Sequence, residues 1–112
     1  MAKTTAPTVT LKQISAEIAE KQELSKKQVT EIMDDLIENI VKNLKKMAED
    51  AKVAIRGARR DANELLKKKT KDKVVSEDEG KRLETEIQKH TDLFIKAIDD
   101  RLAKKEQEVL KL

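Results

Sequence analysis

Five basic residues between positions 52 and 67 are spaced so that a helix would bring their side chains to one side: Lys52, Arg56, Arg59, Arg60 and Lys67. We call this set the basic stripe. Cations in such a row suit a phosphate backbone, because each neutralised phosphate releases counterions. The alternative is a solvated helix face whose Arg stems shield the edge of a core. Phe94 is the only aromatic residue, so stacking on bases has almost no platform and sequence-specific recognition is disfavoured.

The distribution of charge along the chain singles out the same region. The net charge is only +3. Residues 42–73, however, carry 12 Lys and Arg against 5 Asp and Glu, whereas the segments on either side are both slightly acidic. A basic segment between acidic ones favours weak, nonspecific contact with nucleic acid.

No other group of residues has the spacing that catalysis or metal binding requires. His90 is the only histidine, and there is no Cys to join it in a metal site. The adjacent carboxylates Asp34 and Asp35, and likewise Asp99 and Asp100, diverge on a helix and are expected to be solvated. No Gly-rich phosphate loop or nucleophile elbow is present. The sequence therefore predicts no enzyme, no cofactor, no metal and no small-molecule substrate.

The chain also lacks the apolar segments that membranes and secretion require. No apolar run approaches the roughly 20 residues that span a bilayer, and the N-terminus has no signal-peptide core. We expect a cytoplasmic protein without membrane contact.

Helix-start signals and apolar periodicity divide the chain into an arm and three helices. Residues 1–8 are polar, contain Pro7 and are expected to be a flexible N-terminal arm. Helices are predicted at about 10–21, 26–71 and 77–111, each opened by a capping box that begins at Thr10, Ser25 or Ser76. Apolar residues recur at steps of three and four along the second helix: Val29, Met33, Leu36, Ile40, Leu44, Met47, Ala51, Ala54, Ala58, Ala62 and Leu65.

These elements predict an all-α, elongated three-helix protein in which two antiparallel hairpins share one long central helix. Residues 9–112 would form a single domain about 70 Å long, at 1.5 Å of rise per residue. Counting back from both connections brings the ends of the outer helices together near Ile37, on the same side of the central helix. Two helices in cross-section leave apolar surface uncovered, which favours a homodimer or a more compact bundle.

Several runs in the second half of the chain carry a family resemblance: AKVAIRGARRDAN from Ala51, KDKVVSEDE from Lys71, EIQKHTD from Glu86 and AKKEQE from Ala103. Together, over about residues 46–112, they resemble the C-terminal helical hairpin of bacterial ribosome recycling factor. The resemblance implies two helices of a three-helix bundle, with Arg56, Arg59 and Arg60 in contact with ribosomal RNA. The family's first bundle helix and its inserted β domain have no counterpart in the chain.

The first 46 residues are similar to a different family. The runs TVTLKQISAEIAE from Thr8, LSKKQ from Leu24 and IMDDL from Ile32 resemble the N-terminal helical hairpin of histone-like DNA-bending proteins. That resemblance implies a helical packing module that dimerises, without the β saddle and arms that bind DNA.

Two families joined within one helix, at about residues 41–47, predict an engineered chimera. In this interpretation the chain is a de novo designed structural helical protein with no intended catalytic or ligand-binding activity. The alternative is an RNA-binding module related to ribosome recycling factor, acting through Lys52, Arg56, Arg59 and Arg60. A natural protein similar to recycling factor is the third hypothesis.

Overall fold

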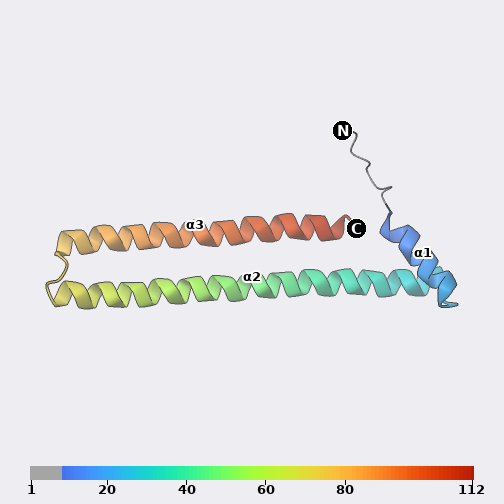
Figure 1. The fold of residues 1–112 in the computed structure, drawn as a ribbon, viewed down its shortest axis with the longest axis horizontal. Coiled ribbons are helices and arrows are strands. Elements are labelled where there is room, and N and C mark those ends of the chain that lie inside the picture. The colour runs from blue at the N-terminus through green and yellow to red at the C-terminus, as the bar shows by residue number, and fades with distance from the viewer. Residues whose placement is uncertain (1–8) are drawn as a thin grey trace, which may run out of the picture.

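The structure, a computed structural model, describes residues 9–112, which form three α-helices and no strand (Figure 1). Helix α1 spans Leu11–Lys21, α2 spans Lys26–Lys71 and α3 spans Glu77–Leu110. Helices α2 and α3 form a long antiparallel hairpin, and α1 packs against the start of α2. The described residues extend over 74 × 40 × 15 Å, which confirms the predicted elongated, all-α fold. The predicted N-terminal arm, residues 1–8, lies outside the described residues.

Side-chain caps explain where α1 and α2 begin. The Thr10 hydroxyl accepts the backbone N–H of Gln13 at 3.2 Å, and the Gln13 side chain accepts the N–H of Thr10 at 3.0 Å. Ser25 and Gln28 exchange the same pair of bonds, both at 3.1 Å. Each capping box satisfies two N–H groups that the helix leaves free.

The third predicted capping box is only half formed. The Ser76 hydroxyl accepts the Glu79 N–H at 3.2 Å. The Glu79 carboxylate does not return a bond to Ser76; it lies 3.7 Å from Arg82, one turn further along α3. A carboxylate at this position has an ion-pair partner that the Gln side chains of the first two boxes do not have.

Helices α1 and α2 end in the same hydrogen-bond pattern, a Schellman motif. At the end of α2, the N–H of Val74 donates to the Lys69 carbonyl at 3.0 Å and the N–H of Lys73 donates to the Thr70 carbonyl at 3.1 Å. The motif needs a left-handed residue, which is Lys73 at φ 59° here and Glu23 at φ 57° after α1. Neither position is a glycine, so both connections carry backbone strain.

We predict that Lys73→Gly stabilises the protein by about 1 kcal/mol, since glycine adopts this φ without the steric penalty of a side chain. Urea denaturation followed by circular dichroism would measure the change. Lys68→Gly is the matched control, because it removes an exposed lysine inside α2 and should destabilise by a similar amount. A loss of stability in Lys73→Gly would contradict the role assigned to this turn.

The core between α2 and α3 is one row of side chains thick. On α2, only Ala48 is buried within this interface; on α3, Thr91 is buried, nearer to the connection between the two helices. The Thr91 hydroxyl donates to the Ile87 carbonyl at 2.7 Å, so its polar atom has a partner. Half-buried apolar residues continue the row along both helices: Val41, Leu44, Ile55, Ala62, Leu66, Leu83, Ile87, Ile98, Leu102 and Val109.

The two helices approach each other closely beside the connection that joins them. A Cβ atom added at Gly80 would lie 2.9 Å from the Thr70 hydroxyl oxygen, inside normal contact. Thr70 cannot easily turn aside, because the same oxygen donates to the Leu66 carbonyl at 2.9 Å. Gly80 therefore permits the close approach of α3 to α2 at this end.

We predict that Gly80→Ala fails to give the gain of about 1 kcal/mol that alanine usually brings to a helix. The new methyl group would push against Thr70 and separate the helices. In a Thr70→Ala background the obstructing oxygen is absent, and there the same change should stabilise the protein. A double-mutant cycle of urea midpoints measures this coupling; equal effects of Gly80→Ala in both backgrounds would refute it.

The predicted meeting of the outer helices is wrong. Helices α1 and α3 do not contact each other, and α1 crosses the start of α2 obliquely (Figure 1). The expected register assumed that α1 lies along α2, but α1 buries only the small residues Ser15 and Ala19. It does so over Val29, which lies about 100° around α2 from the Ala48 row. The outer helices thus occupy neighbouring faces of α2, and much of the apolar band stays exposed.

Candidate nucleic-acid interface

The α2–α3 hairpin is a flat layer of two helices and therefore has two broad faces. One face carries most of the basic stripe on α2 and acidic or amide side chains on α3; we call it the basic face. The opposite, apolar face carries Leu36, Met47, Ala54, Ala58 and Leu65 of α2 and Phe94 of α3. A single continuous α2, unbroken at Gly57, keeps the residues of each face in a straight row (Figure 1).

Lys52, at the start of the basic stripe, links α2 to α3 through its side chain. Its ammonium nitrogen donates to the Asp99 carboxylate on α3 at 2.8 Å and lies 3.6 Å from Glu49. Only 17% of its side chain is exposed. A second bridge, Lys45 to Glu106 at 3.5 Å, repeats the link about two turns away.

The hydrogen bond to Asp99 raises the pKa of Lys52 above its ordinary value of 10.5. Its contribution to stability is therefore complete below about pH 10.5 and is lost as the pH rises through the raised pKa. We predict that the melting temperature falls on the alkaline side and that Asp99→Asn makes this fall smaller. Thermal melts at about pH 9 and about pH 11.5 test this; the same alkaline loss in both proteins would contradict the linkage.

The other cations of the basic stripe differ in whether their side chains bond to α3 or are exposed to solvent, where a ligand could reach them. Arg59 leans toward α3, where its guanidinium donates to the Gln88 side chain at 3.4 Å. Arg56 is 3.7 Å from Glu49, and its side chain is 43% exposed. Arg60 and Lys67 are exposed and have no ion pair among residues 9–112. The stripe thus divides into Lys52 and Arg59, which face α3, and Arg56, Arg60 and Lys67, which face solvent.

The acidic and amide partners on α3 were missed by sequence reasoning. Asp99 is exposed, as expected of a solvated carboxylate, and its side chain is also the partner of Lys52. Gln88 accepts from Arg59 and donates to Asp92 at 2.9 Å. The available signal was the antiparallel register itself, which brings the acids of one helix level with the cations of the other.

A shallow groove of about 360 Å³ continues the basic face toward the closed end of the hairpin. It is lined by Asn63, Leu66, Lys67 and Thr70 of α2 and by Glu77, Gly80, Lys81 and Glu84 of α3. Within the described chain, the Asn63 side-chain oxygen is buried without a hydrogen-bond partner. Lys67 and Lys81 thus place cations beside an unpaired amide, at the end of the row of exposed arginines.

The remaining candidates do not form a chemical site. His90 is exposed on α3, and Asp34 and Asp35 are exposed near the start of α2. Within residues 9–112, no three His, Cys, Asp or Glu side chains are grouped so that they would hold a metal. The same span contains no helix that is both long and apolar enough to cross a bilayer.

Comparison with known proteins identifies the hairpin. The sequence model of the family described as "Ribosome recycling factor" matches residues 27–110. The chain is 51% identical over 84 residues to the ribosome-recycling factor of Clostridium kluyveri. It is 55% identical over 75 residues to that of Carboxydothermus hydrogenoformans and 50% identical over 82 residues to that of Bdellovibrio bacteriovorus.

These alignments cover most of this chain but less than half of each relative. They include 75%, 67% and 73% of the chain, and 45%, 40% and 44% of the three relatives, respectively. No solved structure matches the chain.

The prediction of an engineered chimera with a histone-like part is therefore wrong, and so is the prediction of a designed structural protein. The family match begins at residue 27 and passes through the expected junction at 41–47 without a break. Helix α2 is thus a helix of one family over nearly its whole length, which explains why its apolar band is continuous. The chain belongs to the ribosome recycling factor family.

Proposed function

We propose that this chain binds the ribosome by contacting ribosomal RNA through the exposed part of the basic stripe, Arg56, Arg60 and Lys67. The observation that carries the proposal is the division of the stripe: the other cations are held by α3, while these three face solvent. The relatives are named ribosome-recycling factors, which supports the ribosome as the partner.

The geometry favours recognition of a phosphate backbone rather than of bases. Arg56 and Lys67 are separated by about 16 Å along α2, at 1.5 Å per residue. Cations in a straight row of this length can neutralise successive phosphates, and Arg can contact a phosphate with two parallel hydrogen bonds. The basic face has no aromatic side chain to stack on a base, since Phe94 lies on the apolar face.

The proposed role is that of a non-catalytic translation factor that acts where ribosomes are, in the cytoplasm. The α2–α3 hairpin serves as a rigid rod that carries the cations, and the bridges at Lys45 and Lys52 hold its two helices in register. Recycling itself is a proposal for this chain, which spans about 45% of the length of the relatives that it matches.

The test is a titration of large ribosomal subunits, and of ribosomal RNA fragments, with fluorescently labelled protein at several salt concentrations. We expect the variant Arg56→Ala/Arg60→Ala/Lys67→Ala to bind at least about 10-fold more weakly. The slope of log affinity against log salt should also fall, by about 0.7–0.9 for each phosphate that the variant no longer neutralises.

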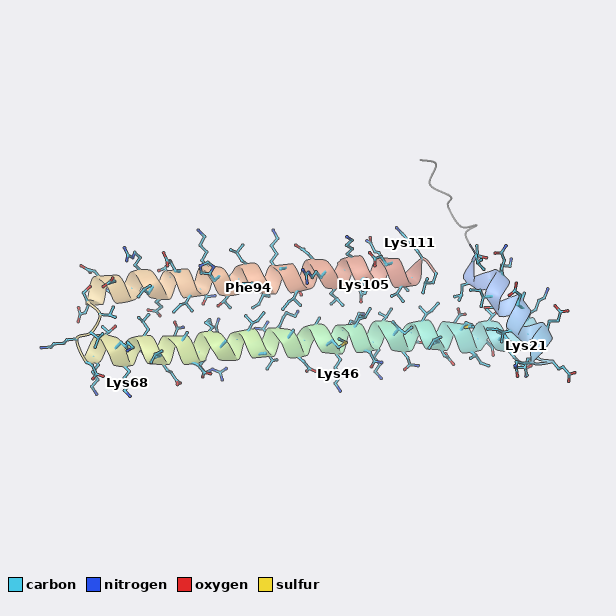
Figure 2. The ribbon with its side chains drawn as sticks, viewed as in Figure 1. Lys21, Lys46, Lys68, Phe94, Lys105 and Lys111 are labelled. Atoms are coloured by element: carbon cyan, nitrogen blue, oxygen red, sulfur yellow. The ribbon has the colours of Figure 1, made fainter. Side chains whose placement is uncertain are left out.

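The matched control replaces three exposed lysines away from the basic face, Lys46, Lys68 and Lys104, and removes the same net charge. Figure 2 shows Lys46 and Lys68 on the edge of α2 that points away from α3. This control should keep most of the affinity and most of the slope. Equal losses in the two triple variants would show that net charge alone drives binding and would overturn the assignment of the face.

A further inference from the structure

A polar trough lies between α2 and α3 on the basic face, next to the groove at the closed end of the hairpin. It has a volume of about 690 Å³ and is lined chiefly by Asn63 of α2 and by Lys81, Glu84, Gln88, Lys89 and Asp92 of α3. The groove and the polar trough share Asn63, Lys81 and Glu84, so they form one continuous depression. The trough has no apolar lining residue, which suits a polar, hydrated ligand.

Lysines of α3 add a second row of cations to the basic face. Lys81 and Lys89 line the polar trough, and Lys96 lies on the same side of α3 as Lys89, about two turns further along. All three side chains are exposed, and none of them is in an ion pair among residues 9–112. We call Lys81, Lys89 and Lys96 the lysine row; it is about 22 Å long, at 1.5 Å of rise per residue.

The lysine row runs beside the exposed cations of α2. The ion pairs that link the two helices show which of their residues are level, and they place residues 56–67 of α2 beside residues 84–95 of α3. That stretch of α2 carries Arg56, Arg60 and Lys67. The two rows of cations therefore lie on either side of the polar trough.

Two carboxylates, Glu84 and Asp92, lie in the polar trough among these cations. Both side chains are exposed, and neither is in an ion pair within the described part of the chain. Gln88 donates to one oxygen of Asp92 at 2.9 Å, which leaves the other oxygen free to accept. A carboxylate repels a phosphate but accepts a hydrogen bond from a hydroxyl group. The trough thus presents hydrogen-bond acceptors between two rows that attract phosphates.

Double-helical RNA displays the complementary arrangement in its minor groove. That groove is wide and shallow, and it presents ribose 2′-hydroxyl groups between two phosphate backbones. A flat layer of two helices can lie against a shallow groove, and its two rows of cations can each meet one backbone. The minor groove of B-form DNA is only about 6 Å wide and contains no 2′-hydroxyl group.

We propose that the polar trough binds the minor groove of double-helical RNA, with Glu84 and Asp92 accepting hydrogen bonds from 2′-hydroxyl groups. This inference rests on the proposed function, RNA binding by the exposed part of the basic stripe, and specifies the form of RNA that is bound. The cations of α2 contact one phosphate backbone and the lysine row contacts the other. The two carboxylates select RNA over DNA, because DNA would bring phosphates near them without any hydroxyl group.

Fluorescence anisotropy titrations of the full chain at one salt concentration test the proposed ligand. The probes are an RNA duplex of about 16 base pairs, the DNA duplex of the same sequence and one RNA strand alone. We expect the RNA duplex to bind at least about 10-fold more tightly than either other probe, since only it places 2′-hydroxyl groups between two phosphate backbones. Equal binding of the two duplexes, or tighter binding of the single strand, would overturn the inference.

The variant Glu84→Ala/Asp92→Ala separates recognition of 2′-hydroxyl groups from general charge attraction. It should bind the DNA duplex more tightly than the native chain does, because repulsion of the phosphates is removed. The RNA duplex loses hydrogen-bond acceptors at the same time, so the ratio of RNA affinity to DNA affinity should fall to about 3 or less. An unchanged ratio would show that the carboxylates do not contact hydroxyl groups and would overturn the inference.

The matched control is Asp50→Ala/Asp61→Ala, which removes two exposed carboxylates away from the polar trough. Asp61 lies about 200° around α2 from Asn63, and Asp50 lies about three turns before Asp61 on the same side. The control changes the net charge by the same amount, so it should bind both duplexes more tightly by a similar factor and keep the ratio. A ratio that falls equally in both double variants would assign the effect to net charge and overturn the inference.

A failure of this inference can be distinguished from a failure of the proposed function. If Arg56→Ala/Arg60→Ala/Lys67→Ala keeps the affinity for every probe, the proposed function is wrong and the inference falls with it. If that variant loses affinity while the native chain binds the RNA and DNA duplexes equally, the basic stripe binds RNA and only the minor-groove inference is overturned.

Discussion

Replacing Ala48 by Asp should destabilise the α2–α3 hairpin by about 3 kcal/mol, a large share of the 5–15 kcal/mol that typically holds a domain folded. Ala48 is the most buried α2 residue of the row that faces α3. A carboxylate there loses water without gaining a free partner, since the nearest lysine on that side, Lys52, is already bonded to Asp99. If the new carboxylate paired with Lys52, the Lys52–Asp99 bridge between α2 and α3 would be lost.

The control is Val53→Asp, which introduces the same charge into the same helix at a position that is 58% exposed. Its effect should stay within about 0.5 kcal/mol. Urea denaturation at neutral pH gives both values, and Ala48→Asp should recover part of its stability near pH 4, where its carboxyl group becomes neutral. Similar effects of the two substitutions would mean that α2 and α3 do not pack through the Ala48 row.

Replacing Val29 by Asp should release α1 and leave the hairpin folded. Val29 is the most buried of the described residues, and α1 covers it with Ala19 and Ser15. An isolated helix of 11 residues is marginal in water, so α1 should unfold once it no longer packs on α2. Helices α2 and α3 do not depend on α1, which contacts only α2.

Hydrogen exchange resolves this prediction residue by residue. Amides of α1 from Ser15 to Lys21 should lose their protection in Val29→Asp, while those in the middle of α2 should keep theirs. Val29→Ile is the conservative control and should preserve both sets. Protection that falls together throughout the chain would show that α1 and the hairpin fold as one cooperative unit.

The helices and their starts could be predicted from sequence, because those features depend on local chemistry. A Thr or Ser followed three residues later by Gln marked the first residues of α1 and α2, and both capping boxes are confirmed. The same pattern with Glu79 did not close, because Arg82 competes for a charged side chain but not for an amide.

The packing of α1 and the division of the basic stripe could not be predicted in the same way. Apolar spacing shows that Val29 and Ala48 lie in one broad band, but not that α1 and α3 cover different parts of it. The basic stripe was predicted from the spacing of residues in α2 alone. That spacing contains no information about the α3 side chains that bond to Lys52 and Arg59. The packing of α1 and the division of the basic stripe both depend on contacts between helices, which local sequence patterns do not specify.

The family assignment accounts for the continuous apolar band of α2, which indicates a single helix rather than two joined ones. The apolar band of α2 crosses residues 41–47 without a change of period, which is what a single helix of one family produces. The chimera hypothesis required that two unrelated helices be joined so that their apolar residues lie on the same side of the combined helix. The match over residues 27–110 explains the same observation without that requirement.

Directed hydroxyl-radical probing tests most directly whether the basic face binds ribosomal RNA. Val53→Cys and Ala54→Cys would each carry a tethered iron chelate in a chain that has no other cysteine. Both residues are exposed, and their side chains diverge by about 100° on α2, Val53 toward the basic face and Ala54 on the apolar face. Bound to large ribosomal subunits, the probe at Val53 should cleave ribosomal RNA at discrete positions, and the probe at Ala54 should cleave it weakly. Equal cleavage from both positions, or stronger cleavage from Ala54, would contradict the account.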